Sequence, residues 1–203
     1  MLRASKIRDK IKRGERRMII GITGKSGTGK SYLSEYLSKK LHFKHIDIDK
    51  LSHKIFDFSE SHMFLKTNFG PDIFCKEKID RKKLGEIAFK NKTKLKKLNM
   101  FFKTKIEEEL DHIMLFEKNV ILDYALLPGL IQFKLCDYKI LLKEADQLRY
   151  ERIFKREGIS KEYFDMRDKS LDEYDESKFD IVVQSPTKKD ADNIIKTIKE
   201  KLW

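Results

Sequence analysis

A glycine-rich octapeptide near the start of the chain has the residue types and spacing of a phosphate-binding loop. It reads Gly24-Lys25-Ser26-Gly27-Thr28-Gly29-Lys30-Ser31, so that a glycine and four further residues precede Gly-Lys-Ser. Glycines let the backbone wrap closely around phosphate oxygens, and the start of a following helix adds free N–H groups and a partial positive charge. Lys30 would reach the β- and γ-phosphates and Ser31 would hold Mg²⁺. We therefore expect a nucleoside triphosphate to bind here, with contacts from Gly24, Gly27, Thr28, Gly29, Lys30, Ser31 and Tyr32.

Acidic residues follow two apolar segments farther along the chain. Asp47 and Asp49 leave a short segment at 45–47, and Asp123 ends the apolar run 119–123. An extended chain would send the side chains of Asp47 and Asp49 in opposite directions, so that one faces an acceptor hydroxyl and the other faces metal or protein. The alternative is that such an acid caps the next helix. Asp123 would contact Mg²⁺ directly or through water, or would instead bond a side chain of the phosphate loop.

Basic residues recur in a densely charged segment, 149–168, which Gly158 interrupts. Arg152 and Arg156 lie one helical turn apart, and they would therefore project from one face. A mobile lid with this composition would carry both guanidinium groups to the phosphates as it closes, and Arg149 is a weaker candidate. A solvated charged helix is the alternative. His53, one turn after Asp49, would line an acceptor pocket or stand as a surface imidazole.

The elements that must position these residues alternate between strand and helix patterns. Short apolar segments at 18–23, 45–47, 119–123, 138–142 and 179–183 are predicted strands, and helical stretches separate them. This order predicts an α/β fold with a parallel sheet covered on both faces, whose loops at the carboxyl ends of the strands bind ligand. The stretch of about 50–118 is too long for a simple crossover and is predicted to be an inserted helical subdomain for the second substrate. Residues 190–202 are predicted to form a closing amphipathic helix.

Composition narrows the class of protein further. The chain has 203 residues, 40% of them hydrophobic, and a net charge of +12. Half of that charge lies in a basic extension, residues 1–17, whereas basic residues elsewhere are mixed with acidic ones. We therefore expect no specific nucleic-acid partner. Cys75 and Cys136 lack metal-site spacing and read as ordinary thiols of a reducing compartment. No apolar run approaches the ~20 residues of a membrane span, so a cytoplasmic protein is expected, as a monomer or weak homo-oligomer.

At this point the chain, from Met18 to Trp203, resembles the dephospho-CoA kinase family, which uses ATP to phosphorylate the ribose 3′-hydroxyl of dephospho-CoA in the last step of coenzyme A synthesis. The resemblance rests on the segment before and through the phosphate loop and on Asp47-Ile48-Asp49 with the four residues that follow. It also rests on Asp80-Arg81-Lys82-Lys83-Leu84-Gly85, on the pair Arg152 and Arg156, and on 179–182. The stretch beginning at Asp80 discriminates best, because generic nucleotide kinases lack it there.

The resemblance implies a phosphate-loop (P-loop) kinase fold, nucleoside-monophosphate-kinase-like, with a five-stranded parallel sheet. It implies that Asp49 is the base on the ribose hydroxyl and that Lys30, Arg152 and Arg156 neutralise the transferring phosphoryl group. ATP and Mg²⁺ are the implied cofactors, and dephospho-CoA is the implied small-molecule substrate. The helical insertion would hold the CoA moiety, with substrate contacts from Asp47, Asp49, His53 and Arg81; Ser31 and Asp123 would serve the metal.

The chain departs from the family pattern on the acceptor side. Lys103-Thr104 stand where the family usually has His-Pro, and the segment 125–129 lacks a family acid. Gln184 replaces an asparagine after the fifth strand. Two alternatives therefore stay open: a diverged kinase for another hydroxyl acceptor such as a nucleoside, and a nucleotide-binding protein without turnover.

Overall fold

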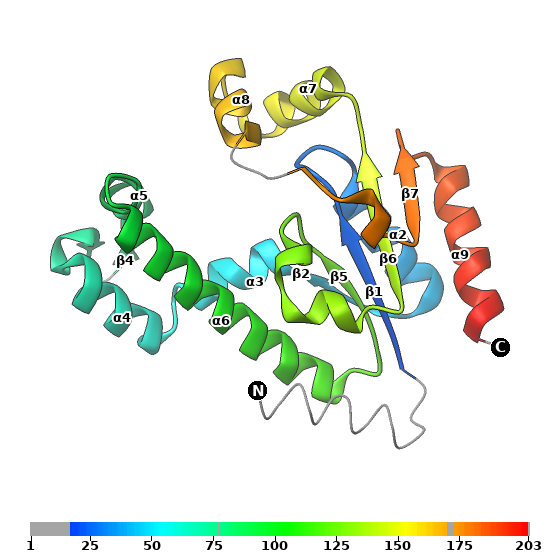
Figure 1. Ribbon diagram of the computed structural model, residues 1–203, viewed down its shortest axis with the longest axis horizontal. Helices are drawn as coiled ribbons and strands as arrows, with labels where there is room; N and C mark the ends of the chain where they lie inside the picture. Colours follow the sequence, from blue (N-terminus) through cyan, green and yellow to red (C-terminus); the bar gives the residue numbers. More distant parts are fainter. Residues whose placement is uncertain (1–16, 77, 170–172, 203) are drawn as a thin grey trace.

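The computed structural model describes residues 17–76, 78–169 and 173–202 (Figure 1). In chain order its helices and strands are β1 (Met18–Thr23), α2 (Lys30–Leu41), β2 (Lys44–Asp47), α3 (Ile48–Ile55), α4 (Ser59–Phe69), β3 (Phe74–Cys75), β4 (Lys78–Ile79), α5 (Arg81–Phe89), α6 (Lys92–Phe116), β5 (Asn119–Asp123), β6 (Tyr138–Lys143), α7 (Asp146–Glu157), α8 (Lys161–Lys169), β7 (Ile181–Gln184) and α9 (Lys188–Leu202). Short 3₁₀ helices occupy Pro71–Ile73, Leu127–Gly129, Ile131–Leu135 and Glu176–Lys178.

The central sheet has five strands in the order β2-β5-β1-β6-β7, and every neighbouring pair is parallel. This confirms the predicted fold class. β1 is buried along its whole length because β5 and β6 flank it. The register places Asp123 beside both Ile22 and Asp47, so the carboxyl ends of β1, β2 and β5 meet at one edge of the sheet. The phosphate loop and both predicted acidic segments therefore converge there.

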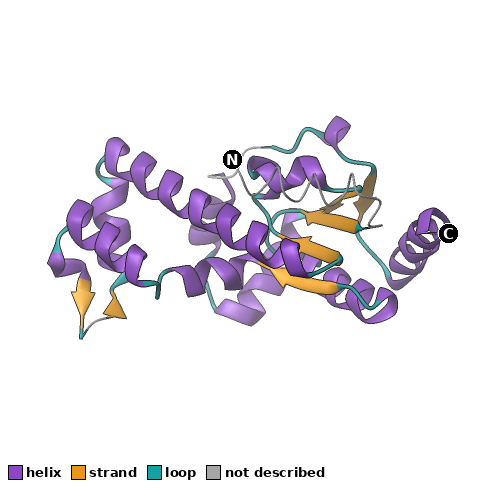
Figure 2. Cartoon of the chain, turned by 90° about the horizontal axis from the view of Figure 1, so that it is seen from below, coloured by secondary structure: helices purple, strands orange, loops and turns teal. Residues whose placement is uncertain are grey.

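Each face of the sheet is covered by helices (Figure 2). Alternate residues of β1 serve opposite faces: Ile20 and Ile22 pack with α2 and α9, whereas Ile19 packs with α3 and α6. This alternation follows from the period of two in a strand. The result is two apolar layers that fix the sheet edge on which the ligand loops stand.

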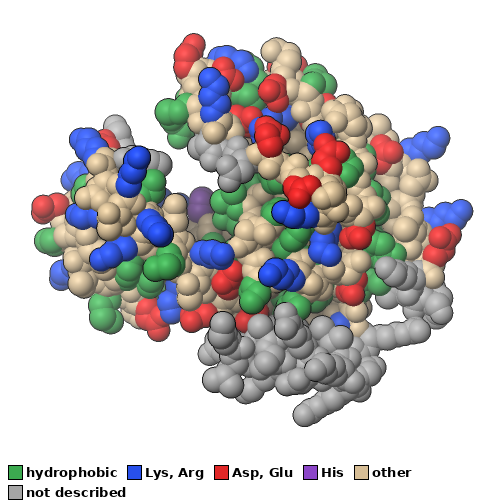
Figure 3. Space-filling view, viewed as in Figure 1, with side chains coloured by type: hydrophobic (Ala, Val, Ile, Leu, Met, Phe, Trp, Pro, Cys, Tyr) green, Lys and Arg blue, Asp and Glu red, His purple; other side chains and the backbone are tan. Residues whose placement is uncertain are grey.

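The segment between β2 and β5 extends away from the sheet as helices α3 to α6 (Figure 1). Leu110 of α6 is fully buried in the same cluster as Leu65 of α4, and the rings of Phe56 and Phe102 stack at 4.0 Å. The segment also contains a two-stranded antiparallel pair, β3–β4, which the helical periodicity did not predict. Two dipeptide strands are too short to leave a periodic signal. Figure 3 shows lysine and arginine side chains gathered on the outer surface of this helical segment.

Several predicted boundaries are corrected by the structure. The last strand begins at Ile181 rather than 179, and the closing helix begins at Lys188. The charged segment predicted at 149–168 is two helices, α7 and α8, and the first of these begins at Asp146. Cys75 is exposed, unlike Cys136. Residues 1–16 of the basic extension lie outside the described residues, and within the described part of the chain no helix is apolar and long enough to cross a bilayer.

Candidate active site

The phosphate loop connects β1 to α2 and lies against the end of β6. A Cβ on Gly24 would stand 2.5 Å from the backbone oxygen of Leu142, so only glycine allows this close approach. Thr28 is buried and its hydroxyl donates to the Lys25 carbonyl oxygen at 2.9 Å, which closes the turn. Ser31, in the first turn of α2, is exposed. The loop thus has the folded shape that its glycines predict, with the helix amino end facing the sheet edge.

Lys30 is the buried cation of the site. Only 9% of the residue is exposed, and its amine donates to the Lys25 carbonyl oxygen at 3.2 Å. Burial lowers the pKa of the Lys30 amine, the charges of Asp123 and Asp49 oppose that effect, and those of Arg156 and Arg149 add to it. The structure therefore brings four predicted or candidate charged groups within electrostatic range of the Lys30 amine.

Asp47 and Asp49 take different positions because the chain turns into α3 at Ile48. Asp47 is the N-cap of α3: its carboxylate accepts the Lys50 backbone N–H at 2.9 Å and pairs with the Lys50 amine at 2.9 Å. The capping alternative therefore holds for Asp47, and the extended-chain premise was wrong. Asp49 lies exposed in the first turn of α3, and partial desolvation of its carboxyl raises the pKa of that group, with Lys30 opposing and Asp47 and Asp123 adding.

Asp123 is buried at the end of β5 and carries an orphaned oxygen. Its Oδ2 lies 3.4 Å from Nε2 of His45, and among the described residues neither atom has a hydrogen-bond partner; the hydroxyl of the neighbouring Thr23 has none either. Buried polar atoms are usually satisfied, so these point to a missing water or ion. Mg²⁺ typically takes one or two carboxylates together with substrate phosphates and water. Asp123 and Ser31 fit such a site.

The arginines of α7 differ in what they contact. Arg152 donates to the Gly27 carbonyl oxygen at 2.9 Å and pairs with the buried Glu144 at 2.9 Å. Arg156 is more exposed and pairs with Glu157. Arg149, only 2% exposed, donates from Nε to the Ser26 carbonyl oxygen at 3.0 Å. Arg149 therefore contacts the phosphate loop as Arg152 does, which helical spacing alone did not reveal; whether either arginine serves the phosphates stays a prediction.

The two remaining predicted substrate residues lie together in the helical insertion. Arg81, at the start of α5, donates to the His53 carbonyl oxygen at 3.4 Å, and its guanidinium stands 4.7 Å from the ring centre of Phe56. His53 itself is exposed on α3. No contact joins this pair to the phosphate loop in the described structure, so their role stays a prediction.

Two cavities open at this edge of the sheet. A cavity of about 300 Å³ adjoins the phosphate loop; it is lined by Thr28, Gly29, Tyr32, Leu33, Arg152, Pro186, Thr187 and Ala191. A larger cavity of about 550 Å³ lies between α6, the segment after β5 and residues 173–179. Its polar and aromatic lining includes Asn99, Phe102, Lys103, Tyr124, Tyr174 and Lys178. Burial, together with the charge of Asp49, raises the pKa of Tyr124 to about 12.

The sequence missed several of these lining residues. Pro186 and Thr187 follow β7 and reach the smaller cavity only because β7 lies next to β6 in the sheet. Tyr124 directly follows Asp123, so its position just after a predicted strand could have identified it as a residue of the ligand edge.

Known proteins of one family match most of this chain. The model of the family described as dephospho-CoA kinase matches residues 18–184. A dephospho-CoA kinase of Fusobacterium nucleatum is 35% identical over 180 residues, which cover 83% of this chain and 89% of that protein. The solved structure of a dephospho-CoA kinase from Campylobacter jejuni superposes with a TM-score of 0.62 at 26% identity, covering 91% and 96% of the two chains. The structure of TT1252 from Thermus thermophilus shares the fold, with a TM-score of 0.77, 22% identity and coverage of 93% and 99%. The chain therefore belongs to the dephospho-CoA kinase family.

Proposed function

We propose that this protein transfers the γ-phosphoryl group of ATP to the ribose 3′-hydroxyl of dephospho-CoA, giving coenzyme A and ADP. The observation that carries the proposal is the place of the buried Lys30 amine in the phosphate loop, at the sheet edge where Asp47 and Asp123 end neighbouring strands and Asp49 begins the next helix. Phosphoryl transfer needs a phosphate cradle, cationic clamps and a base for the acceptor hydroxyl. The family membership supports dephospho-CoA as the acceptor.

The nucleotide is assigned to the phosphate loop and the smaller cavity. N–H groups of the loop would bind the polyphosphate. The adenine ring would lie beside Tyr32 and Pro186, with the guanidinium of Arg152 across the cavity. Bound Mg²⁺ would neutralise phosphate charge during transfer. Ser31 and Asp123 would hold the Mg²⁺ ion, and the unpaired Asp123 oxygen would serve as one of its ligands.

The acceptor is assigned to the larger cavity. Its volume of about 550 Å³ and its aromatic rings suit a nucleotide-sized ligand with an apolar arm. Tyr124 lies between this cavity and Asp49: it lines the cavity, and the charge of Asp49 contributes to its raised pKa. Arg81 and His53, which contact each other through the His53 carbonyl oxygen, would contact the acceptor from the insertion.

In the proposed reaction Asp49 accepts the proton of the acceptor hydroxyl while the hydroxyl oxygen attacks the γ-phosphorus, and ADP leaves as the bond to the β–γ bridging oxygen breaks. A raised pKa makes the carboxylate a better proton acceptor. Lys30 stabilises the charge on the transferring group, and Arg152 and Arg156 add to it when α7 and α8 close. The boundaries of the CoA-binding insertion (about 50–118) and of the lid (about 149–168) belong to this proposal, as do a cytoplasmic location and a monomeric or weakly associated state.

The test measures ADP release by the purified protein with Mg²⁺–ATP and dephospho-CoA, adenosine or no acceptor. We expect ADP release that depends on dephospho-CoA. ADP release only with adenosine would show that the acceptor is a nucleoside instead. ATP binding without ADP release under any condition would refute the proposed catalytic activity. Asp49→Asn should reduce turnover by roughly 10²-fold or more while ATP affinity stays near normal, since loss of a general base typically costs that much. Asp57→Asn, an exposed acid just beyond α3, is the matched control and should behave as wild type.

A further inference from the structure

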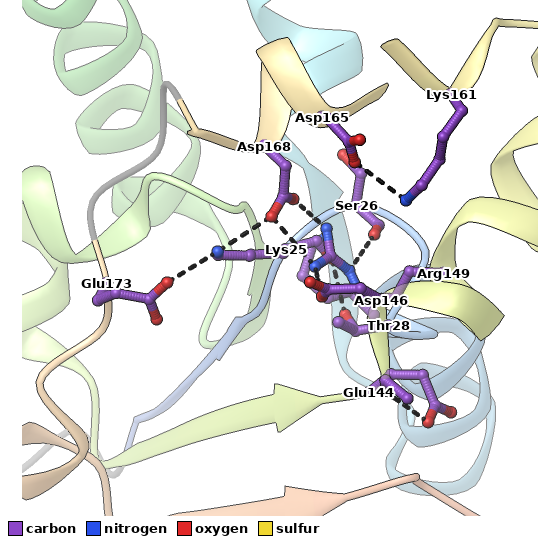
Figure 4. A network of polar contacts seen from close by, with 12 residues as sticks. Lys25, Ser26, Thr28, Glu144, Asp146, Arg149, Lys161, Asp165, Asp168 and Glu173 are labelled. Atoms are coloured by element: carbon purple, nitrogen blue, oxygen red, sulfur yellow. Dashed lines mark hydrogen bonds and ion pairs between the residues drawn. The ribbon is translucent and has the colours of Figure 1, made fainter. Parts of the chain in front are cut away.

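A cluster of charged side chains joins the phosphate loop to α8, outside the groups used above (Figure 4). The amine of Lys25 lies 3.1 Å from the Asp168 carboxylate, near the end of α8, and 3.0 Å from the Glu173 carboxylate. Lys25 and Asp168 are mostly buried, with side chains 17% and 15% exposed, whereas the Glu173 side chain is 88% exposed. The Lys25–Asp168 contact is thus the sheltered one.

Asp168 also binds Arg149 of α7. Both terminal nitrogens of the Arg149 guanidinium donate to this carboxylate, one at 3.3 Å, and the Arg149 Nε holds the Ser26 carbonyl oxygen at 3.0 Å. The guanidinium packs 5.2 Å from the ring centre of Phe164, which is on α8. Asp146 supplies a second carboxylate at 2.8 Å, but its side chain is 73% exposed. One carboxylate of α8 therefore bridges a cation of the phosphate loop and a buried cation of α7.

The titration behaviour agrees with this geometry. Burial alone would lower the pKa of the Lys25 amine, but its hydrogen bonds to Glu173 and Asp168 raise it. Burial alone would raise the pKa of the Asp168 carboxyl, but Arg149 and Lys25 lower it. Lys25 and Asp168 are therefore both charged near neutral pH. Removing one partner from such a sheltered cluster leaves an uncompensated charge.

The cluster also reaches the wall of the larger cavity. Glu173, the exposed partner of Lys25, lines that cavity together with the adjacent Tyr174. The Tyr174 hydroxyl donates to the Ala125 carbonyl oxygen at 2.9 Å, just beyond β5. Lys25 is thus connected on one side to α8 and on the other to the segment that closes the proposed acceptor site.

We propose that Asp168 is a positioning residue for phosphoryl transfer: its carboxylate holds α8 and α7 against the phosphate loop through Lys25 and Arg149. This rests on the proposed function, because the distance between the two substrates depends on that alignment. In this proposal Asp168 acts through Lys25 and Arg149 and contacts neither substrate. Its negative charge next to a polyphosphate site opposes nucleotide binding, so its role is alignment rather than affinity.

This role predicts a separation of kcat from ATP affinity. In Asp168→Asn, Lys25 and Arg149 lose a shared counter-charge beside the site of an anion, so ATP should bind as tightly as in wild type or more tightly. The lost alignment should lower kcat about tenfold or more, because a displacement of ~1 Å can cost 10²-fold in rate. A merely structural role would instead weaken ATP binding and turnover together, since both need the folded loop.

The experiment compares Asp168→Asn with Asp165→Asn, one turn earlier on α8, whose partner is Lys161 of the same helix at 2.9 Å. ATP affinity is measured by calorimetry, kcat by ADP release, and the opening of α8 by amide hydrogen exchange without nucleotide. We expect faster exchange in α8 and a lower kcat at unchanged or higher ATP affinity in Asp168→Asn alone, with partial rescue by Asp168→Glu. Unchanged kcat, or a parallel loss of ATP affinity, would overturn the proposal.

A second variant covers the case in which Asp168→Asn does not fold. Lys25→Gln removes the loop cation and leaves the Arg149–Asp168 pair intact. It should accelerate exchange in α8, and the same exchange as wild type would count against the bridge. These exchange and binding measurements do not depend on the acceptor. A wild-type protein that is inactive with dephospho-CoA would refute the proposed function. Faster α8 exchange in Asp168→Asn than in the wild type would still support the bridge in that case.

Discussion

Replacement of Gly27 by alanine tests how tightly the phosphate loop packs against α7. Gly27 has φ +83°, and a Cβ there would stand 2.8 Å from the backbone oxygen of Arg149 and 3.0 Å from its Cα. These are backbone atoms of a helix, so no side-chain rotation can remove the contact. An ordinary van der Waals contact begins near 3.4 Å, which means that loop and helix must separate by about 0.6 Å.

The expected effect follows from the strain of that residue. The left-handed conformation costs an alanine about 1–2 kcal/mol, and the contact with Arg149 adds to this. The variant can relieve both by moving the loop away from its present shape, and ATP binding must then restore the shape. A cost of 1–2 kcal/mol corresponds to a factor of about 5–30, so the Kd for Mg²⁺–ATP should rise by at least that factor.

Calorimetric titration with Mg²⁺–ATP, together with thermal unfolding, provides the assay. Gly70→Ala is the matched control, because Gly70 has φ +93° but nothing within 4 Å of its missing Cβ and stands at the end of α4. It should lose stability from the strain of its own positive φ and keep the ATP affinity of the wild type. If Gly27→Ala binds ATP as tightly as the wild type, the close packing of loop on α7 is not a condition for nucleotide binding and the reasoning fails.

Two further outcomes follow from the structure. Turnover should fall as the pH drops through the raised pKa of Asp49, because only the ionised carboxylate accepts a proton; a kcat/KM profile that keeps this acidic limb in Asp49→Asn would contradict the assignment. Leu110→Ala, at a fully buried position of α6, should lower the free energy of unfolding by about 2–5 kcal/mol in urea titrations, whereas Met63→Ala, 66% exposed, should change it by about 0.5 kcal/mol or less. Equal effects of the two would show that α6 does not pack as described.

The phosphate loop could be predicted from the sequence because its residue types and spacing form one continuous motif. Gly24 through Gly29 connect a strand to the helix that begins at Lys30, although the loop then packs against Leu142 and Arg149, far away in the chain. The family resemblance was available for the same reason, since it rests on short continuous segments. The residue pattern left open whether Asp47 or Asp49 faces the acceptor, and only the resemblance pointed to Asp49, because the answer depends on the chain becoming helical at Ile48 rather than staying extended.

The sequence by itself determined the α/β class, the phosphate loop and the acids that end β2 and β5, because strand and helix periodicity and glycine spacing express local backbone preferences. Only the tertiary structure decided that Arg149 and Arg152 of α7 both reach the loop, that Pro186 borders the cavity beside it, and that Asp168 bridges Lys25 and Arg149. Lys25 and Asp168 are 143 positions apart. Their contact arises because β1 and β6 are neighbours in the sheet, and strand order is a property of the whole packed chain rather than of any segment.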